Sequence, residues 1–160
     1  MTAVLSAAQR VWLSSGYFVP PHEEREDLAK TARAGVDVQI VVPSHSDVPA
    51  TIYAARASYG DLLQAGAHIY EVHNAVLHSK LATIDGVWST VGSSNLDRRS
   101  VLFNNEVDAI ILGRDTAAQV EAILRQDMTM AHDITLAKWQ QRSLGERWDE
   151  LKARVWQYWM

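Results

Sequence analysis

Two residues with complementary chemistry, His78 and Lys80, stand two positions apart in the middle of the chain. Residues two apart on a β-strand point to the same face of a sheet, so an imidazole and an ammonium would lie side by side. An imidazole can act as a nucleophile or carry a proton, and an ammonium can balance the negative charge that develops on a phosphoryl group. The pair therefore predicts a site for an anionic centre such as a phosphate.

Uncharged hydrogen-bond donors follow at Ser93, Ser94 and Asn95, and Gly92 before them permits a close approach of the backbone. With Asp85 in between, the whole pattern is His-x-Lys, four residues, Asp, six residues, Gly-Ser-x-Asn. The donors add stabilisation for developing phosphoryl charge. No cluster of carboxylates of the kind that a two-metal site requires accompanies them in the sequence, so we expect the chemistry to need no metal and no other cofactor.

The composition bounds the class of protein. The chain has 160 residues and a formal net charge of −4, from 15 Lys and Arg against 19 Asp and Glu. This length, with 48% hydrophobic residues, predicts a single globular domain over residues 1–160. The acidic balance argues against a strongly basic nucleic-acid binder. The absence of cysteine excludes disulfide scaffolds, cysteine zinc sites, iron–sulfur clusters and a cysteine nucleophile.

The elements that must position the reactive residues alternate between strands and helices. Strands are expected at 11–14, 36–42, 67–72, 80–84, 88–91 and 107–112, and helices at 2–9, 22–34, 48–65 and 115–130. The Asp85-Gly86 dipeptide favours a tight hairpin turn between two of these strands, and Asp47 is placed to cap the helix that follows it. The order predicts an α/β fold with a mixed, largely parallel sheet sandwiched between helices.

The C-terminal segment is rich in tryptophan, with four of the six Trp residues in the last 22 positions. A capping-box pattern at Ser143 and Glu146 predicts a helix over 143–160. Its aromatic stripe either packs on the sheet or on a partner, or contacts a membrane interface, where tryptophan beside Lys and Arg is typical. No apolar run reaches the roughly 18 residues of a membrane span, and residues 1–5 lack the basic start of a secretory signal.

The spacing resembles a known signature. The HKD motif of the phospholipase D superfamily is matched by His78, Lys80, Asp85, Gly92, Ser93 and Asn95. From about Leu5 to the end, the chain also resembles the C-terminal half of bacterial cardiolipin synthases, most clearly at 17–20, 35–38, 62–66, 69–71, 95–100 and 104–106. The resemblance implies a phospholipase D-like half-domain, because the family normally carries two HKD halves in one chain and this chain has one.

The resemblance also implies a role for each catalytic position. His78 would be the nucleophile that forms a phosphohistidine, or the acid that protonates the leaving alcohol, depending on its partner half. Lys80 and Asn95 would hold phosphate oxygens. Asp85, part of the catalytic motif, would act structurally. Glu106 lies where the family places the acid that orients the motif histidine through its other ring nitrogen.

Five further residues are expected to bind substrate. Ser93 would support the phosphate pocket, with Ser94 at the variable position of the motif. Tyr17 and Phe18 lie on a loop that the family places by the mouth of the site, although both also fit a core position at a strand end. Arg99 would attract an anionic headgroup or pair with a surface carboxylate.

The implied function is phosphatidyl transfer from a phosphatidylglycerol-like lipid, through a phosphohistidine, to the hydroxyl of a second lipid. A second HKD half, supplied by a homodimer or by a separate N-terminal half, is the expected protein partner. With water as acceptor, the enzyme would be a phospholipase D or a nuclease-type phosphodiesterase. A non-catalytic half that binds anionic lipid or another half is the third hypothesis. The expected location is the bacterial cytoplasm or the inner face of the cytoplasmic membrane, with peripheral membrane contact, and nucleic acid is not an expected partner.

Overall fold

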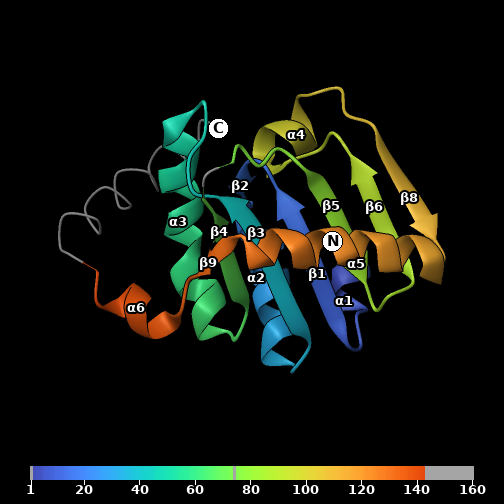
Figure 1. Ribbon diagram of the computed structural model, residues 1–160, viewed down its shortest axis with the longest axis horizontal. Helices are drawn as coiled ribbons and strands as arrows, with labels where there is room; N and C mark the ends of the chain where they lie inside the picture. The colour runs from blue at the N-terminus through green and yellow to red at the C-terminus, as the bar shows by residue number, and fades with distance from the viewer. Residues whose placement is uncertain (1, 74, 143–160) are drawn as a thin grey trace.

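The computed structural model describes residues 2–73 and 75–142, and within them a mixed sheet lies between helices (Figure 1). The seven strands follow the spatial order β8-β6-β5-β1-β3-β4-β9. Neighbours β1, β3 and β4 are parallel, and the remaining pairings of this sheet are antiparallel. The strands are β1 (Arg10–Ser15), β3 (Asp37–Pro43), β4 (His68–Val72), β5 (Lys80–Ile84), β6 (Trp88–Gly92), β8 (Asp108–Leu112) and β9 (Ala131–Asp133). The α/β fold with a mixed sheet between helices is confirmed, but the sheet is not largely parallel: two of its six strand pairings are parallel and four are antiparallel, because β5, β6, β8 and β9 all run against their neighbours.

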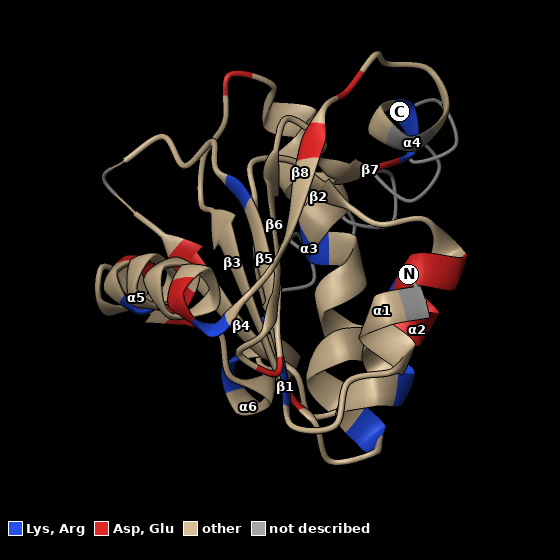
Figure 2. Cartoon of the chain, turned by 90° about the vertical axis from the view of Figure 1, so that its right-hand side faces the viewer, with Lys and Arg blue, Asp and Glu red and all other residues tan. Residues whose placement is uncertain are grey.

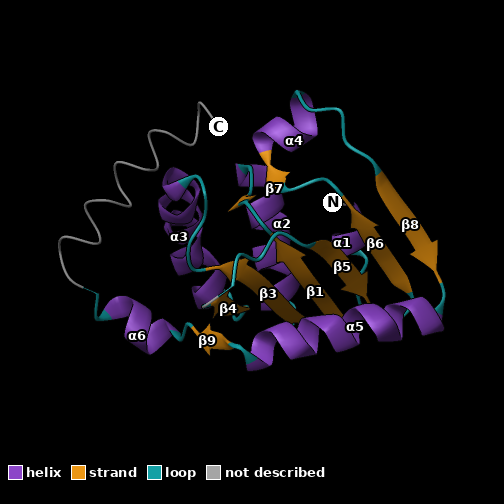
Figure 3. Cartoon of the chain, turned by 45° about the horizontal axis from the view of Figure 1, so that its top comes forward, coloured by secondary structure: helices purple, strands orange, loops and turns teal. Residues whose placement is uncertain are grey.

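Helices lie on both sides of this sheet (Figure 3). The long helix α5 (Arg114–Thr129) crosses one face, and α1 (Thr2–Leu5), α2 (His22–Arg33) and α3 (Pro49–Gln64) lie on the other. The short helix α6 (Leu136–Gln140) packs beside α3, and its Trp139 ring lies 5.1 Å from the ring of Tyr59. Trp139 is therefore a packing residue, whereas the helix predicted at 143–160 lies outside the described residues.

The central strand β3 is buried on both faces, which explains its nearly continuous run of β-branched residues. Val38, Ile40 and Val42 pack into the core beneath α2 and α3. Val41, which points the other way, packs with Trp12 beneath α5. The strand ends at Pro43, which begins the loop toward α3.

A second, two-stranded ladder lies at one end of the sheet. It pairs β2 (Phe18–Val19) with β7 (Leu96–Asp97) in parallel, and α4 (Arg98–Leu102) follows directly. Asp97 caps α4 by accepting a hydrogen bond from the Ser100 amide at 2.7 Å. These three short elements, with β9 and α6, are too brief to show a periodic pattern and were absent from the sequence-based expectation.

The predicted cap of α3 is wrong. The helix is preceded by Val48, and no side chain caps its first turn. The Asp47 carboxylate instead accepts hydrogen bonds from the hydroxyls of Tyr17 and Ser46, at 2.8 and 3.0 Å. Pro49 at the start of α3 has no amide hydrogen that needs a partner, and the Thr51 amide donates to the Val48 carbonyl at 2.9 Å.

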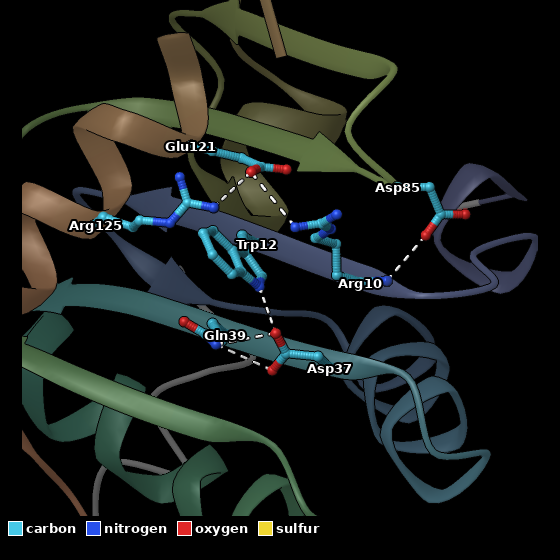
Figure 4. A network of polar contacts seen from close by, with 7 residues as sticks. All are labelled: Arg10, Trp12, Asp37, Gln39, Asp85, Glu121 and Arg125. Carbon is cyan, nitrogen blue, oxygen red and sulfur yellow. Dashed lines mark hydrogen bonds and ion pairs between the residues drawn. The ribbon is translucent and has the colours of Figure 1, made fainter. Parts of the chain in front are cut away.

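A polar network ties α5 to the sheet (Figure 4). Glu121 of α5 pairs with Arg125 at 2.8 Å and with Arg10 of β1 at 3.5 Å. The Arg125 guanidinium lies 4.8 Å from the centre of the Trp12 ring, and the Trp12 Nε1 donates to Asp37 at 2.8 Å. The network fixes the sheet beneath α5 and leaves the end that carries the reactive residues free.

In the described part of the chain, no helix is both long and apolar enough to cross a membrane.

Candidate active site

Three chain segments meet at one end of the sheet. β1 ends at Ser15 opposite Lys80, where the antiparallel strand β5 begins. The parallel pairing of β2 with β7 places residues 18–19 beside 96–97. The loop after β1, the approach to β5 and the loop after β6 therefore converge, and they carry the histidine, lysine and asparagine of the HKD motif.

His78 lies against the backbone at Gly16. A Cβ added at Gly16 would stand 3.0 Å from His78 Nδ1, 3.2 Å from His78 Cα and 3.4 Å from Asn95 Oδ1. The Tyr17 ring meets the imidazole edge-on, with 5.8 Å between ring centres and an angle of 77°. Because Nδ1 is packed against Gly16, Nε2 is the ring nitrogen left to face a ligand.

Asn95 both joins two loops and leaves a donor free. Its Oδ1 accepts a hydrogen bond from the Tyr17 amide at 3.0 Å. Ser15 reinforces the junction, since its hydroxyl donates to the Tyr17 carbonyl and accepts from the Leu96 amide. With Oδ1 engaged, the Nδ2 amide group of Asn95 is the part that can donate to a phosphate oxygen.

Lys80 contributes a partly buried cation. Its Nζ donates to the His78 carbonyl at 2.8 Å, which holds the ammonium beside the histidine. Partial burial lowers the pKa of Lys80 below the usual lysine value, and the Glu106 and Asp97 carboxylates counteract that effect. In its ammonium form the side chain can face an anionic phosphoryl group.

The two motif serines connect the loop after β6 to the segment before β8. The Ser93 hydroxyl donates to Glu106, and the Ser94 hydroxyl donates to Asp108. Gly92 is required here because a Cβ at this position would lie 2.6 Å from the Cα of Asp108. The close approach predicted for Gly92 is thus made by a neighbouring strand.

Glu106 does not bond His78 in this structure. Its carboxylate accepts from the Ser93 hydroxyl and, at 3.1 Å, from the Asn104 amide. These hydrogen bonds lower the pKa of Glu106, and the bond from Ser93 has the largest effect. In this single chain Glu106 therefore does not orient the histidine as expected, because the Nδ1 side of His78 faces Gly16.

Comparison with known proteins decides the family. The family described as "Cardiolipin synthase, PLD-like domain" matches residues 1–128. The chain belongs to this PLD-like family. A cardiolipin synthase of Geobacillus sp. (strain WCH70) is 36% identical over 154 residues, which are 96% of this chain and 31% of the relative. Cardiolipin synthase 1 of Staphylococcus aureus (strain COL) is 31% identical over 152 residues. The chain spans about a third of the length of these relatives.

Solved structures show the same PLD-like fold. Nuc, a phospholipase D family member from Salmonella typhimurium, superposes with a TM-score of 0.73 at 20% identity, covering 84% of this chain and 87% of that one. The phosphatidylserine synthase of Haemophilus influenzae gives a TM-score of 0.75 at 14% identity, covering 96% of this chain and 39% of that one. At such identities the likeness establishes the fold alone.

Asp85, the third residue of the PLD-like motif, lies away from the other two. It follows the far end of β5, and at a strand rise of ~3.3 Å per residue it stands roughly 16 Å from Lys80. Its carboxylate accepts from the amides of Ala8, Gln9 and Arg10 at 2.8 to 2.9 Å. Burial alone would raise the pKa of Asp85, but these donors and the nearby Arg10 charge lower it overall. The position of Asp85 fits a structural role and excludes contact with a ligand at His78.

A cavity of about 180 Å³ adjoins Asn95. Its lining joins polar and apolar residues: Tyr17, Val19, Val48, Thr51, Asn95, Asp97, Arg99 and Asn104. Arg99 lines the same cavity as Asn95. Phe18 does not: its side chain is 1% exposed and packs in the core, so the expected substrate contact is not available to it.

Sequence reasoning missed Gly16 and Ser15 as parts of the site. Both lie where β1 ends, next to the strand that begins at Lys80. The signal was present as a Ser-Ser-Gly run after a buried strand, because small residues at that point permit another chain segment to approach closely. In the described part of the chain, no group of three or more His, Asp or Glu residues is placed to hold a metal ion.

Proposed function

We propose that this chain is one catalytic half of a cardiolipin synthase-type phosphatidyltransferase. The observation that carries the proposal is the convergence of His78, Lys80 and Asn95 at one end of the sheet, with His78 exposed and its Nδ1 side against Gly16. Membership of the PLD-like family and identity of 31 to 36% with proteins named cardiolipin synthase support phosphatidyl transfer as the reaction.

In the proposed first step, Nε2 of His78 forms a bond to phosphorus of a phosphatidylglycerol-like lipid. The bond between phosphorus and the oxygen of the headgroup glycerol breaks, and a second histidine protonates that oxygen. In the second step the hydroxyl of another lipid attacks phosphorus and gives its proton to the second histidine. The phosphorus–nitrogen bond to His78 then breaks. In a symmetric pair, either histidine can take either role.

Lys80 and Asn95 stabilise the phosphoryl oxygens in this proposal. The Lys80 ammonium balances charge, and the Asn95 amide donates a hydrogen bond while its oxygen remains bound to the Tyr17 amide. Because these groups act without a metal, we expect turnover to be unaffected by EDTA.

The second histidine must come from another HKD half, since this chain has one motif. The lipid substrate also requires contact with a membrane surface, which we propose is peripheral. Val76, two residues before His78, is 69% exposed, and Arg99 lines the adjoining cavity. An apolar side chain and a cation beside the site suit the surface of an anionic bilayer.

The test uses vesicles of phosphatidylglycerol with the purified protein, its His78→Ala variant and a matched His68→Ala variant. His68 is an exposed histidine at the opposite end of the sheet, where β4 begins. We expect glycerol release together with cardiolipin formation by the wild type and by His68→Ala, and neither by His78→Ala. Phosphatidic acid as the product would make water the acceptor. Cleavage of single-stranded DNA with no reaction of the lipid would overturn the proposal.

A further inference from the structure

The cavity of about 180 Å³ beside Asn95 is formed by segments that are distant in the sequence. Tyr17 lies on the loop between β1 and β2, Thr51 on the first turn of α3, and Arg99 on α4, and all three line the cavity. Figure 2 shows α4, with its basic residues in blue, directly after β7 at this end of the sheet. Because the Tyr17 ring also meets His78 edge-on, this side chain adjoins both the cavity and the reactive imidazole.

Arg99 supplies a cation to this cavity. In the described part of the chain no carboxylate lies within ion-pair distance of its guanidinium, whereas Arg56 and Arg125 are each paired with a buried glutamate at 2.8 Å. A guanidinium presents parallel N–H donors that match the oxygens of a phosphate group. Arg99 can therefore bind a phosphate group without first giving up an ion pair.

Two oxygen acceptors line the same cavity. Asn104 uses its Nδ2 group to donate to Glu106 at 3.1 Å, so its Oδ1 atom is the part that can accept a hydrogen bond. Asp97 accepts the Ser100 amide through Oδ1 at 2.7 Å, and a carboxylate has capacity for further donors. Val48 adds an apolar side chain on which carbon atoms can pack. The lining thus suits a short polyol that is joined to a phosphate group.

The second step of the proposed reaction has a requirement that hydrolysis lacks. The acceptor hydroxyl oxygen bonds to phosphorus, the bond from phosphorus to Nε2 of His78 breaks, and the hydroxyl proton passes to the second histidine. When the acceptor is phosphatidylglycerol, only the glycerol carbons separate this hydroxyl from a second phosphodiester. That second anion must be held near the reacting phosphorus, and a cation beside the residues that hold the first phosphate can do so.

We propose that this cavity is the subsite for the acceptor lipid, an inference that rests on the proposed function because it concerns the second lipid of that reaction. Arg99 binds the phosphodiester of the acceptor phosphatidylglycerol, and Asp97 and Asn104 accept hydrogen bonds from its glycerol hydroxyls. Asn95 lines the cavity as well, so the donor and acceptor headgroups meet at this residue. Holding the acceptor raises its effective concentration and so favours cardiolipin over phosphatidic acid as product.

The first experiment measures binding without turnover. Glycerophosphoglycerol, the deacylated headgroup, is titrated into isotope-labelled Lys80→Gln protein, in which the cation expected to hold the donor phosphate is absent. We expect the largest changes in amide NMR shifts at Thr51 and Asn104, and an affinity about tenfold or more lower when Arg99→Gln is added. Shifts centred away from the cavity, or an affinity that Arg99→Gln does not change, would overturn the subsite.

The matched control for Arg99→Gln is Arg98→Gln. Arg98 is the preceding residue on α4, is exposed and does not line the cavity, so its substitution removes the same charge from the same helix. The affinity for glycerophosphoglycerol should therefore stay the same in Arg98→Gln. An equal loss of affinity in both variants would assign the effect to the general charge of α4 and overturn the role of Arg99.

The second experiment measures the choice of acceptor. Phosphatidylglycerol vesicles are supplied with labelled free glycerol, which competes as an acceptor but carries no phosphate. Cardiolipin formation and label incorporation share one donor, so their ratio reports on the acceptor alone. We expect this ratio to fall about tenfold or more in Arg99→Gln and to stay unchanged in Arg98→Gln.

The two experiments separate the inference from the function on which it rests. An inactive wild-type protein that binds glycerophosphoglycerol through Arg99 would contradict the proposed function alone. Transfer to both acceptors at a ratio that Arg99→Gln leaves unchanged would contradict the acceptor subsite alone.

Discussion

Gly16 leaves no room for a side chain between itself and His78 at the end of the sheet. A Cβ at position 16 would come within 3.0 Å of the Nδ1 atom and 3.2 Å of the Cα atom of His78. The second of these is a backbone atom, which cannot turn away as a flexible side chain can. The position of the reactive imidazole therefore depends on the absence of a side chain one residue after β1 ends.

Gly16→Ala should displace His78 and lower kcat by about 10- to 100-fold, because small errors in the position of a reacting group have large effects on rate. Steady-state kinetics on lipid vesicles measure this. The control is Gly60→Ala within α3, where the nearest atom would be Trp139 Nε1 at 3.6 Å, an ordinary contact. That variant should keep full activity and gain a little stability. Equal activity of Gly16→Ala and wild type would show that the contact is unimportant.

Asn95→Asp should separate the two functions of the asparagine. The aspartate keeps an oxygen to accept the Tyr17 amide, so the melting temperature should change little. It loses the donor and adds negative charge beside the phosphate, so the rate should fall by about 10²-fold or more. Asn95→Ala removes both groups and should lower the rate and the melting temperature together. Wild-type turnover by Asn95→Asp would remove this residue from the phosphate site.

Lys80 should set an alkaline limit on activity. Partial burial lowers the pKa of Lys80, so its ammonium is lost at a lower pH than that of a free lysine. The values of kcat/KM should accordingly fall on the alkaline side before the ordinary lysine pKa of about 10.4. Lys80→Arg keeps its charge to higher pH. Whatever the maximal rate of this variant, the alkaline fall of its kcat/KM should occur at a higher pH than in the wild type. If kcat/KM falls at the same pH in both proteins, a group other than Lys80 causes the fall.

Asp85→Asn should destabilise the fold in a pH-dependent manner. The pKa of Asp85 is lower in the folded chain than the value of about 3.9 expected when unfolded, so its carboxylate stabilises the fold above that pH and ceases to as pH falls through the folded value. At pH 7 the variant should lose about 1–3 kcal/mol, as expected for hydrogen bonds to a charged group. The difference from wild type should shrink below about pH 4.

Urea unfolding at pH 7 and pH 3 measures the Asp85 effect. Asparagine tolerates the positive φ of 52° at this position, so the substitution tests charge and hydrogen bonding without new backbone strain. Asp133→Asn, on the exposed edge strand β9, is the matched control and should change stability little at either pH. A constant difference between Asp85→Asn and wild type at the two pH values would contradict the charge-based role.

The larger elements of the fold could be predicted because the spacing of their apolar residues agrees with the proline and turn residues that end them. The run at 36–42 ends at Pro43, and Asp85-Gly86 makes the expected turn with both residues at positive φ. The short elements β2, β7 and α4 could not be predicted, since two to five residues are too few to show a periodic pattern of apolar residues. Their geometry arises from tertiary contacts, such as the Ser15 hydroxyl accepting from the Leu96 amide, 81 positions along the chain.

The candidate site was predictable where a motif has fixed spacing, and less so where the fold brings in distant residues. His78 and Lys80 belong to one short segment, so their proximity follows from the sequence. Gly16 reaches them only through the pairing of β1 with β5. Phe18 shows the converse: its neighbour Tyr17 lies edge-on to His78, whereas Phe18, the first residue of β2, is buried in the core.

The central claim is that His78 becomes covalently bound to phosphorus during turnover. The most direct test is to quench the protein under alkaline conditions, which preserve phosphohistidine, during reaction with phosphatidylglycerol labelled in the phosphatidyl group. Mass spectrometry of the digested chain then locates the label. The account predicts label on the peptide that contains His78, at no more than one per two chains in a dimer, and none in His78→Ala. Label on another residue, or a labelled His78→Ala protein with normal turnover, would contradict it.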